Sequence, residues 1–156
     1  MEIFTLKINK IKWKSILISF FILFFLTTVN ARGNMNLNTD ENSDISILVH
    51  AKSVESKLIE EEGIESKQTK SFIRLYKKEN KDKFIKLYNE SKNIHGKIYA
   101  LVWFFDNDRT LYMRYKNKLN KNEKVTIYNG DVRLISPLSD ILPLIESNTL
   151  KELILY

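Results

Sequence analysis

The side chains best suited to chemistry in this sequence are His95 and the acids that follow it, Asp106 and Asp108. An imidazole beside a carboxylate can act as a general base, and carboxylates on alternate residues of a loop can converge on a cation. If the protein is an enzyme, these three residues are therefore the first to test.

Simpler structural roles account for the same residues. No nucleophile or carboxylate is spaced to form a triad with His95, so we interpret it as a partly exposed histidine at a helix start. His50 lies among apolar residues and fits a helix surface or a hydrogen-bonded buried position better than metal ligation. Asp106 and Asp108 fit helix capping, because the segment lacks the further oxygen ligands and the glycine of an EF-hand loop. The three glutamates at 60–62 fit a solvated helix end.

Composition removes most catalytic classes. The 156 residues include no cysteine, which excludes disulfides, thiolate zinc sites, iron–sulfur clusters and cysteine nucleophiles. There are two histidines, and the sequence has no G-x-S-x-G elbow, phosphate-binding glycine loop, dinucleotide fingerprint or H-E-x-x-H motif. We therefore expect a non-enzymatic protein with no cofactor and no metal.

The N-terminal segment has the three parts of an export signal. Lysines precede an apolar run from Ile16 to Leu26, and Val29 and Ala31 stand at positions −3 and −1 of a cleavage site. The apolar run is about half the roughly 20 residues needed to span a bilayer. We therefore expect residues 1–31 to be a cleaved signal peptide and the mature protein to be periplasmic or secreted. The alternative is an uncleaved membrane anchor at residues 16–29.

The mature chain is predicted to consist of a flexible tether, residues 32–43, and a single domain, residues 44–156. The tether is polar and rich in asparagine, without apolar periodicity. From there, apolar residues recur at a spacing of three and four. This spacing predicts a helix that is capped by Ser43 or Asp44 and ends near Gly63.

A short internal echo predicts two further helices. The sequence FIRLY at 72–76 returns as FIKLY at 84–88. One continuous helix would turn the second copy by about 120° relative to the first, so a break near Asn80 brings both apolar stripes to one core. The predicted helices are 68–78 and 81–91, followed by 95–105 and 109–119. The helix at 95–105 has almost no polar face and is expected to be central and buried.

The dipeptide Asn129-Gly130 between two alternating runs predicts a β-hairpin at residues 124–135. With Asn129-Gly130 as the turn, Tyr128 faces Asp131, and the apolar residues of both strands fall on one face. Ser136 and Pro137 then predict a final short helix, kinked or ended early at Pro143. The predicted fold is α+β and mostly α, with several short packed helices and one C-terminal β-hairpin.

The segment Gly96-Lys97-Ile98-Tyr99-Ala100-Leu101 is followed by Asp106, a helix, the Asn129-Gly130 turn and an apolar run over 132–141. In the order of these features, residues 71–145 resemble a family of small exported bacterial proteins. The family is largely uncharacterised, and one member is encoded in a microcin gene cluster. The resemblance implies an exported helical domain with a hairpin and brings no catalytic residues. Relatives often have cysteines near the positions of Val102 and Asp131, so a disulfide bridge between them, if relatives have one, is missing here.

Charge is segregated along the chain. Residues 67–124 carry 16 basic and 6 acidic side chains, residues 32–66 carry 3 and 8, and residues 125–156 carry 2 and 4. The aromatic residues of the basic segment have helical spacing, so we interpret them as core and the lysines as a solvated face. Cleavage of the signal would reduce the net charge from +6 to +3. This reduction and the expected export argue against a nucleic-acid partner.

We therefore expect an exported binding or accessory protein whose basic face contacts an acidic protein, an anionic envelope polymer or an anionic lipid surface. The candidate contact residues are lysines of the segment 67–124, namely Lys77, Lys78, Lys81, Lys83, Lys116, Lys118, Lys121 and Lys124. The alternatives are a cell-envelope-directed hydrolase and an immunity-type protein against a secreted peptide toxin. The immunity alternative rests only on the genomic setting of one relative of the resembled family.

Overall fold

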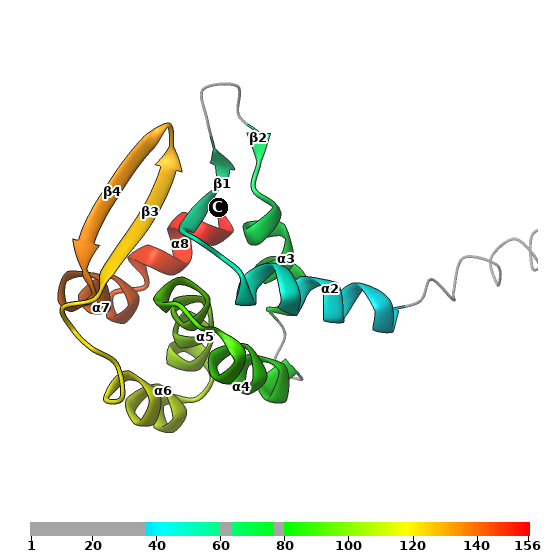
Figure 1. Cartoon of the computed structure of the whole chain (residues 1–156), viewed down its shortest axis with the longest axis horizontal. Coiled ribbons are helices and arrows are strands. Elements are labelled where there is room, and N and C mark those ends of the chain that lie inside the picture. The colour runs from blue at the N-terminus through cyan, green and yellow to red at the C-terminus, as the bar shows by residue number, and fades with distance from the viewer. Residues whose placement is uncertain (1–36, 60–63, 77–79) are drawn as a thin grey trace, which may run out of the picture. The chain divides into compact units, whose positions relative to one another are not determined.

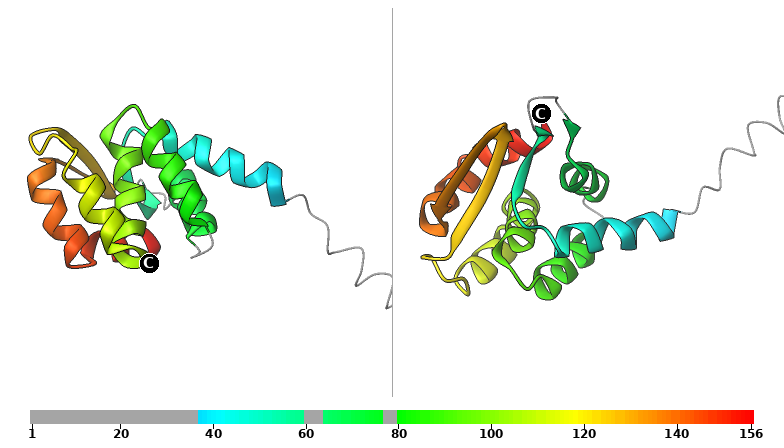
Figure 2. Two further views of the ribbon diagram at one scale, coloured as in Figure 1. Left: turned by 90° about the horizontal axis from the view of Figure 1, so that it is seen from below. Right: turned by 45° about the horizontal axis from the view of Figure 1, so that its top comes forward.

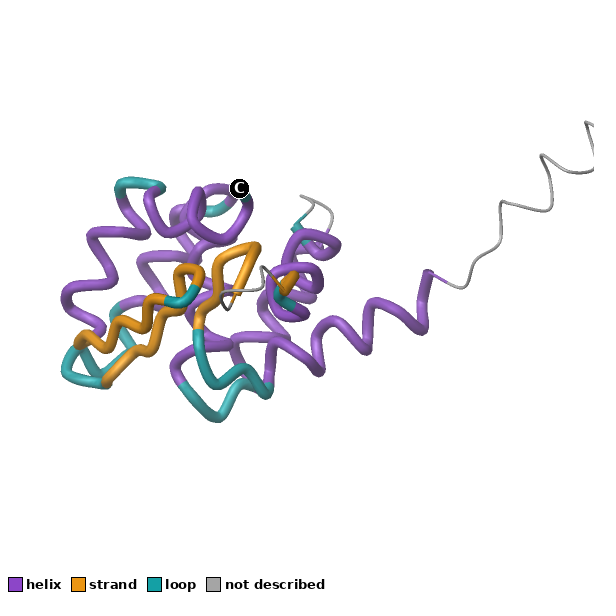
Figure 3. Tube along the Cα trace, turned by 90° about the horizontal axis from the view of Figure 1, so that it is seen from above, coloured by secondary structure: helices purple, strands orange, loops and turns teal. Residues whose placement is uncertain are grey.

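The computed structural model describes residues 37–59, 64–76 and 80–156, and the predicted signal peptide lies outside these ranges (Figure 1). The fold is α+β and mostly helical, as the sequence predicts (Figure 3). Its elements follow in the order α2 (Leu37–Val49), β1 (Val54–Ile59), β2 (Ile64–Glu65), α3 (Lys67–Leu75), α4 (Lys81–Glu90), α5 (Ile94–Asn107), α6 (Arg109–Lys116), β3 (Lys124–Gly130), β4 (Val132–Pro137), α7 (Leu138–Glu146) and α8 (Thr149–Leu155).

The strands form one four-stranded sheet in the order β2-β1-β3-β4, so they are not confined to the predicted C-terminal hairpin. β1 runs parallel to β3, with Val54 opposite Ile127, and the other two pairs of strands are antiparallel. The prediction of a helix through residues 44–63 is therefore wrong over β1. Val54, Ser56 and Leu58 also alternate with polar residues, and pairing with the distant β3 outweighs the helical spacing.

The bounds of the first helix also differ from the prediction. α2 begins at Leu37, inside the predicted tether, and ends at Val49. Asp44 therefore lies within the helix and does not cap it. Its carboxylate is 2% exposed and accepts a 2.8 Å hydrogen bond from Nε of Arg74 on α3. This long-range ion pair has no signature in the local sequence, which is why the sequence suggested a cap.

The short helices of the centre confirm the argument from the internal echo. α3 and α4 are separate, and the side-chain amide of Asn80 donates a 2.8 Å hydrogen bond to the Leu75 carbonyl at the break. Phe72 and Phe84, the first residues of the two copies, are both fully buried, with ring centroids 5.9 Å apart.

The central helix α5 is buried from Ile98 to Phe105, as predicted. It lies between α4 and α6 and packs against β1 and β3 (Figure 2).

The hairpin forms with a different register from the one predicted. Asn129 pairs with Val132 and Tyr128 with Arg133, so the turn residues are Gly130 and Asp131. Gly130 has φ of +62°, and Asp131 is not left-handed, as in a type II′ turn that has glycine first. Each partner shifts by two residues, which preserves the faces of both strands.

The C-terminal region contains one more helix than the sequence predicts. Pro137 occupies the N-cap position of α7, and Pro143 lies inside this helix, which ends three residues later at Glu146. Asn148, with φ of 63°, then leads into α8. α8 packs against α7 and β1 and so completes the core behind the sheet.

Candidate functional site

His95 links the start of α5 to the sheet. The Asn93 side chain caps α5 by accepting from the His95 backbone N–H at 3.1 Å. The His95 Nε2 atom accepts a 3.0 Å hydrogen bond from the Thr126 backbone N–H, so the ring proton resides on Nδ1. Burial lowers the pKa of His95, which keeps the imidazole neutral. The Nδ1 atom is buried and has no partner among the described residues.

The two aspartates lie at the other end of α5, and the predicted capping role is confirmed for Asp108. Its carboxylate accepts from the Leu111 backbone N–H at 3.1 Å at the start of α6, and from the Lys81 ammonium at 2.7 Å. The hydrogen bond from Lys81 is the main reason that the pKa of Asp108 is lowered.

Asp106 accepts hydrogen bonds from Tyr76 at 2.6 Å and from Lys151 at 3.0 Å. Burial acts to raise the pKa of Asp106, but these two hydrogen bonds lower it overall. Asp106 follows His95 by eleven positions in α5, a rise of about 16.5 Å at 1.5 Å per residue. The structure therefore does not bring the residues of the hydrolase hypothesis together.

His50 is the first residue after α2 and not part of the helix, so the predicted buried position is wrong. It is exposed, and its Nδ1 atom lies 2.8 Å from the Ser46 carbonyl oxygen. In the described part of the chain, no three histidine or acidic side chains are grouped so that they could hold a metal ion. The glutamates at 60–62 lie outside the described residues.

A polar network around Glu55 was not identified from the sequence. The Glu55 carboxylate accepts hydrogen bonds from Ser53 at 2.7 Å, Ser66 at 2.6 Å and Gln68 at 2.6 Å. The buried Tyr99 hydroxyl accepts from the Glu55 backbone N–H at 3.0 Å. These contacts join β1, α3 and α5. The side-chain donors are neutral, and two of them, Ser66 and Gln68, come from the start of α3, so no local motif around Glu55 indicates the network.

The structure divides the predicted basic face. Lys81 pairs with Asp108, Lys83 with Glu41 on α2, and Lys116 with Glu146 at the end of α7. Lys118, Lys121 and Lys124 are exposed, and no ion pair links them to an acid in the described ranges. Lys77 and Lys78 lie outside the described residues. The lysines near the end of α6 therefore have the strongest case as a contact surface.

The exposed cations continue along α6. We define the basic segment as the six cations of residues 109–124, which are Arg109, Arg114, Lys116, Lys118, Lys121 and Lys124; Glu123 is the one acid in that range. The Lys118 ammonium lies 5.0 Å from the centroid of the Tyr115 ring. Lys116 lies 5.0 Å from the centroid of Tyr112, and the Arg109 guanidinium lies 3.1 Å from that of Phe105. Such contacts hold cations over aromatic rings and restrict their side chains.

A hollow of about 530 Å³ lies beside α6, lined by Phe105, Arg109, Tyr112, Met113, Lys116 and Glu146. Glu146 accepts hydrogen bonds from Lys116 at 2.8 Å and from the Tyr112 hydroxyl at 2.9 Å. These bonds lower the pKa of Glu146, so it stays ionised and balances part of the positive charge. Among the described residues, the other cations of the basic segment form no ion pair with an acid.

The aromatic residues of the basic region belong to the core, as predicted. Tyr112 is 2% exposed and Tyr115 is 7% exposed.

Among the described residues, no helix is long and apolar enough to cross a membrane.

Comparisons of the chain with protein-family models, curated proteins and solved structures gave no match. The resemblance of residues 71–145 to a family of exported proteins therefore stays a prediction.

Proposed function

We propose that the protein is an exported, non-enzymatic binding protein that contacts an acidic protein or an anionic envelope polymer through the basic segment. The observation that carries the proposal is the excess of six cations over one acid in residues 109–124, which form α6, the loop that follows it and the first residue of β3. A concentrated positive surface attracts acidic partners and accelerates their association.

The rings beneath the cations favour this class of partner over nucleic acid. Proteins that bind single-stranded nucleic acid use exposed aromatic faces on which bases stack. Tyr112 and Tyr115 are buried, so they are not available to stack with bases. Their rings instead lie beneath the ammonium groups of Lys116 and Lys118, which lowers the entropy that these side chains lose on binding.

The hydrolase alternative has less support. It requires His95 to act with Asp106 or Asp108, yet His95 accepts a backbone N–H of β3, and the aspartates are used in capping and ion pairs. The immunity alternative has no observation in its favour among these contacts.

Binding to poly-L-glutamate tests the proposal. The double variant Lys118→Glu with Lys121→Glu should weaken binding at least tenfold, because it replaces two cations of the surface by anions. The matched control reverses Lys52 and Lys67, which are exposed but lie outside the basic segment, and so changes the net charge equally. The control should change the Kd less than twofold. Equal losses in the two variants would show that binding follows net charge and would overturn the assignment.

A further inference from the structure

Four of the seven large exposed hydrophobic residues in the described part of the chain surround one cleft. Leu58, Val132, Leu134 and Tyr156 are 50%, 61%, 47% and 86% exposed. Together they line two adjoining hollows beside the hairpin and α8. A contiguous exposed apolar patch on a folded domain marks an interaction site. This cleft is at the turn end of the hairpin, whereas Lys124 of the basic segment begins β3 at the opposite end.

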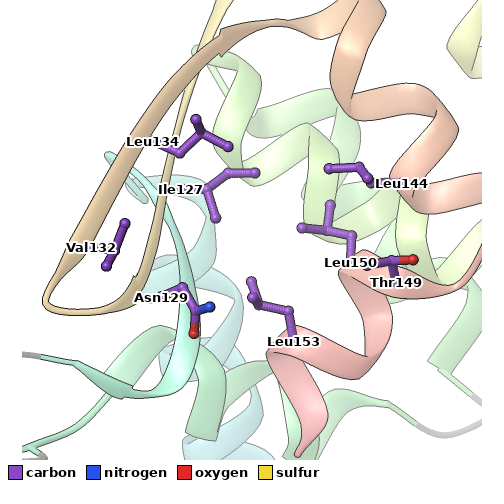
Figure 4. A pocket seen from close by; sticks show the side chains of 8 residues that line it. All are labelled: Ile127, Asn129, Val132, Leu134, Leu144, Thr149, Leu150 and Leu153. Atoms are coloured by element: carbon purple, nitrogen blue, oxygen red, sulfur yellow. The ribbon is translucent and has the colours of Figure 1, made fainter.

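The first hollow is apolar and lies between the hairpin and helices α7 and α8. Ile127 and Leu134 face Leu144 and Leu150 across it (Figure 4). Its volume is about 240 Å³, and its polar lining residues are Asn129 and Thr149. An apolar cavity of about 150 Å³ accommodates benzene. A methylene group is similar in size to a water molecule, which occupies roughly 30 Å³ in the liquid. At that volume for each carbon, the hollow has room for about eight carbons of an alkyl chain.

The second hollow has a cationic wall. It has a volume of about 290 Å³ and shares Asn129 and Leu153 with the first. Lys57 has the one charged side chain among the residues that line it, and no ion pair joins Lys57 to an acid in the described ranges. The Ser56 hydroxyl is already used, because it donates to the Leu58 carbonyl at 2.6 Å and accepts from the Gly130 N–H at 3.1 Å. The apolar hollow thus adjoins, at Asn129 and Leu153, a second hollow that is lined by a lysine.

We propose that this cleft binds a single-chain anionic amphiphile, such as a medium-chain carboxylate. The alkyl chain fills the first hollow, and the carboxylate lies beside Lys57. Both parts of the ligand are then matched by the lining, since the apolar chamber excludes charge and the cation compensates the head group.

Addition of a peptide strand to β4 fits the structure less well. Asn129 and Val132 close a two-residue turn, so the backbone N–H groups of Arg133 and Ile135 point to the unpaired edge of β4. Pro137, the next residue on that edge, has no backbone N–H group. The edge therefore offers few donors to a partner strand.

Calorimetric titration of the full-length chain with hexanoate, octanoate and decanoate, below their micelle concentrations, tests the proposal. We expect one saturable site, with affinity rising roughly fourfold for each added methylene until the hollow is full. The Leu134→Gln variant should weaken decanoate binding at least tenfold. Its control is Ile135→Gln, since Ile135 is equally exposed on the same strand but faces away from the cleft. The control should change the Kd less than twofold.

The head-group position has its own test. Lys57→Gln should weaken decanoate binding about fivefold and leave decanol binding unchanged, while Lys52→Gln should affect neither. Three results would overturn the proposal: no saturation below the micelle concentration, equal weakening by the Leu134 and Ile135 variants, or Leu134-dependent self-association that decanoate does not reverse. The last result would assign the patch to a second copy of the chain.

Discussion

Replacing Gly96 by alanine tests how closely α2 approaches α5. Gly96 is buried near the start of α5. A Cβ atom added there would lie 2.6 Å from the Leu48 carbonyl oxygen and 2.2 Å from the Ser91 hydroxyl oxygen. The Ser91 hydroxyl can move only by giving up its 2.7 Å hydrogen bond to the Leu87 carbonyl. The Leu48 oxygen belongs to the backbone at the end of α2, so its displacement would move that helix.

The cost can be worked from these contacts. Overpacking costs about 1–3 kcal/mol, loss of the Ser91 hydrogen bond costs about 1 kcal/mol, and the helix propensity of alanine returns up to about 1 kcal/mol. We therefore expect Gly96→Ala to lower the free energy of unfolding by about 2 kcal/mol, as measured by urea denaturation at an unchanged m-value.

Two further variants make the Gly96 test specific. Adding Ser91→Ala to Gly96→Ala should recover only part of the loss, because the Leu48 oxygen still blocks the new methyl group. Gly130→Ala is the control without a steric clash, since no atom lies within 4 Å of the added Cβ. It should cost about 1 kcal/mol through its φ of +62° alone. A Gly96→Ala protein within about 0.5 kcal/mol of the parent, or full rescue by Ser91→Ala, would refute the close approach.

Three other predictions follow from single contacts. Because burial lowers the pKa of His95, the contribution of the neutral imidazole to stability is complete above the ordinary histidine pKa of about 6.5 and is lost as the pH falls through the lowered value. Urea denaturation between pH 8 and pH 5 should show this decline in stability, and the His95→Gln variant should not show it. Asp108→Ala should lower the free energy of unfolding by about 1 kcal/mol through loss of the α6 cap. Asp108→Ser should keep most of this stability, because serine can also cap a helix, and equal melting curves for the two variants would contradict the capping role. Tyr99→Phe should cost about 1–3 kcal/mol, because the Glu55 backbone N–H loses its acceptor, and chemical denaturation that matches the parent would exclude this contribution.

Elements whose signals are local could be predicted from the sequence. The echo of FIRLY and FIKLY indicated two short helices, and the apolar run of α5 indicated burial, because both follow from spacing within one segment. The hairpin was also predicted, but its turn was placed one residue too early. Gly130 occupies the first turn position in the structure, and the sequence Asn129-Gly130-Asp131 is compatible with either placement.

Features that depend on distant partners could not be predicted. β1 is a strand because β3 lies beside it, and Asp44 is buried because Arg74 reaches it from α3. The same limit applies to the candidate site. The excess of lysines is visible in the sequence, but the pairing of Lys83 with Glu41 arises only when α4 meets α2.

The salt dependence of binding tests the central claim most directly. The Kd for poly-L-glutamate should be measured over a range of salt concentrations for the parent and for Lys118→Gln with Lys121→Gln. Each lysine that contacts a polyanion contributes about one unit to the slope of log Kd against log salt. We therefore predict that the slope falls by about two units in the double variant. An unchanged slope would contradict the assignment of the contact surface to the basic segment.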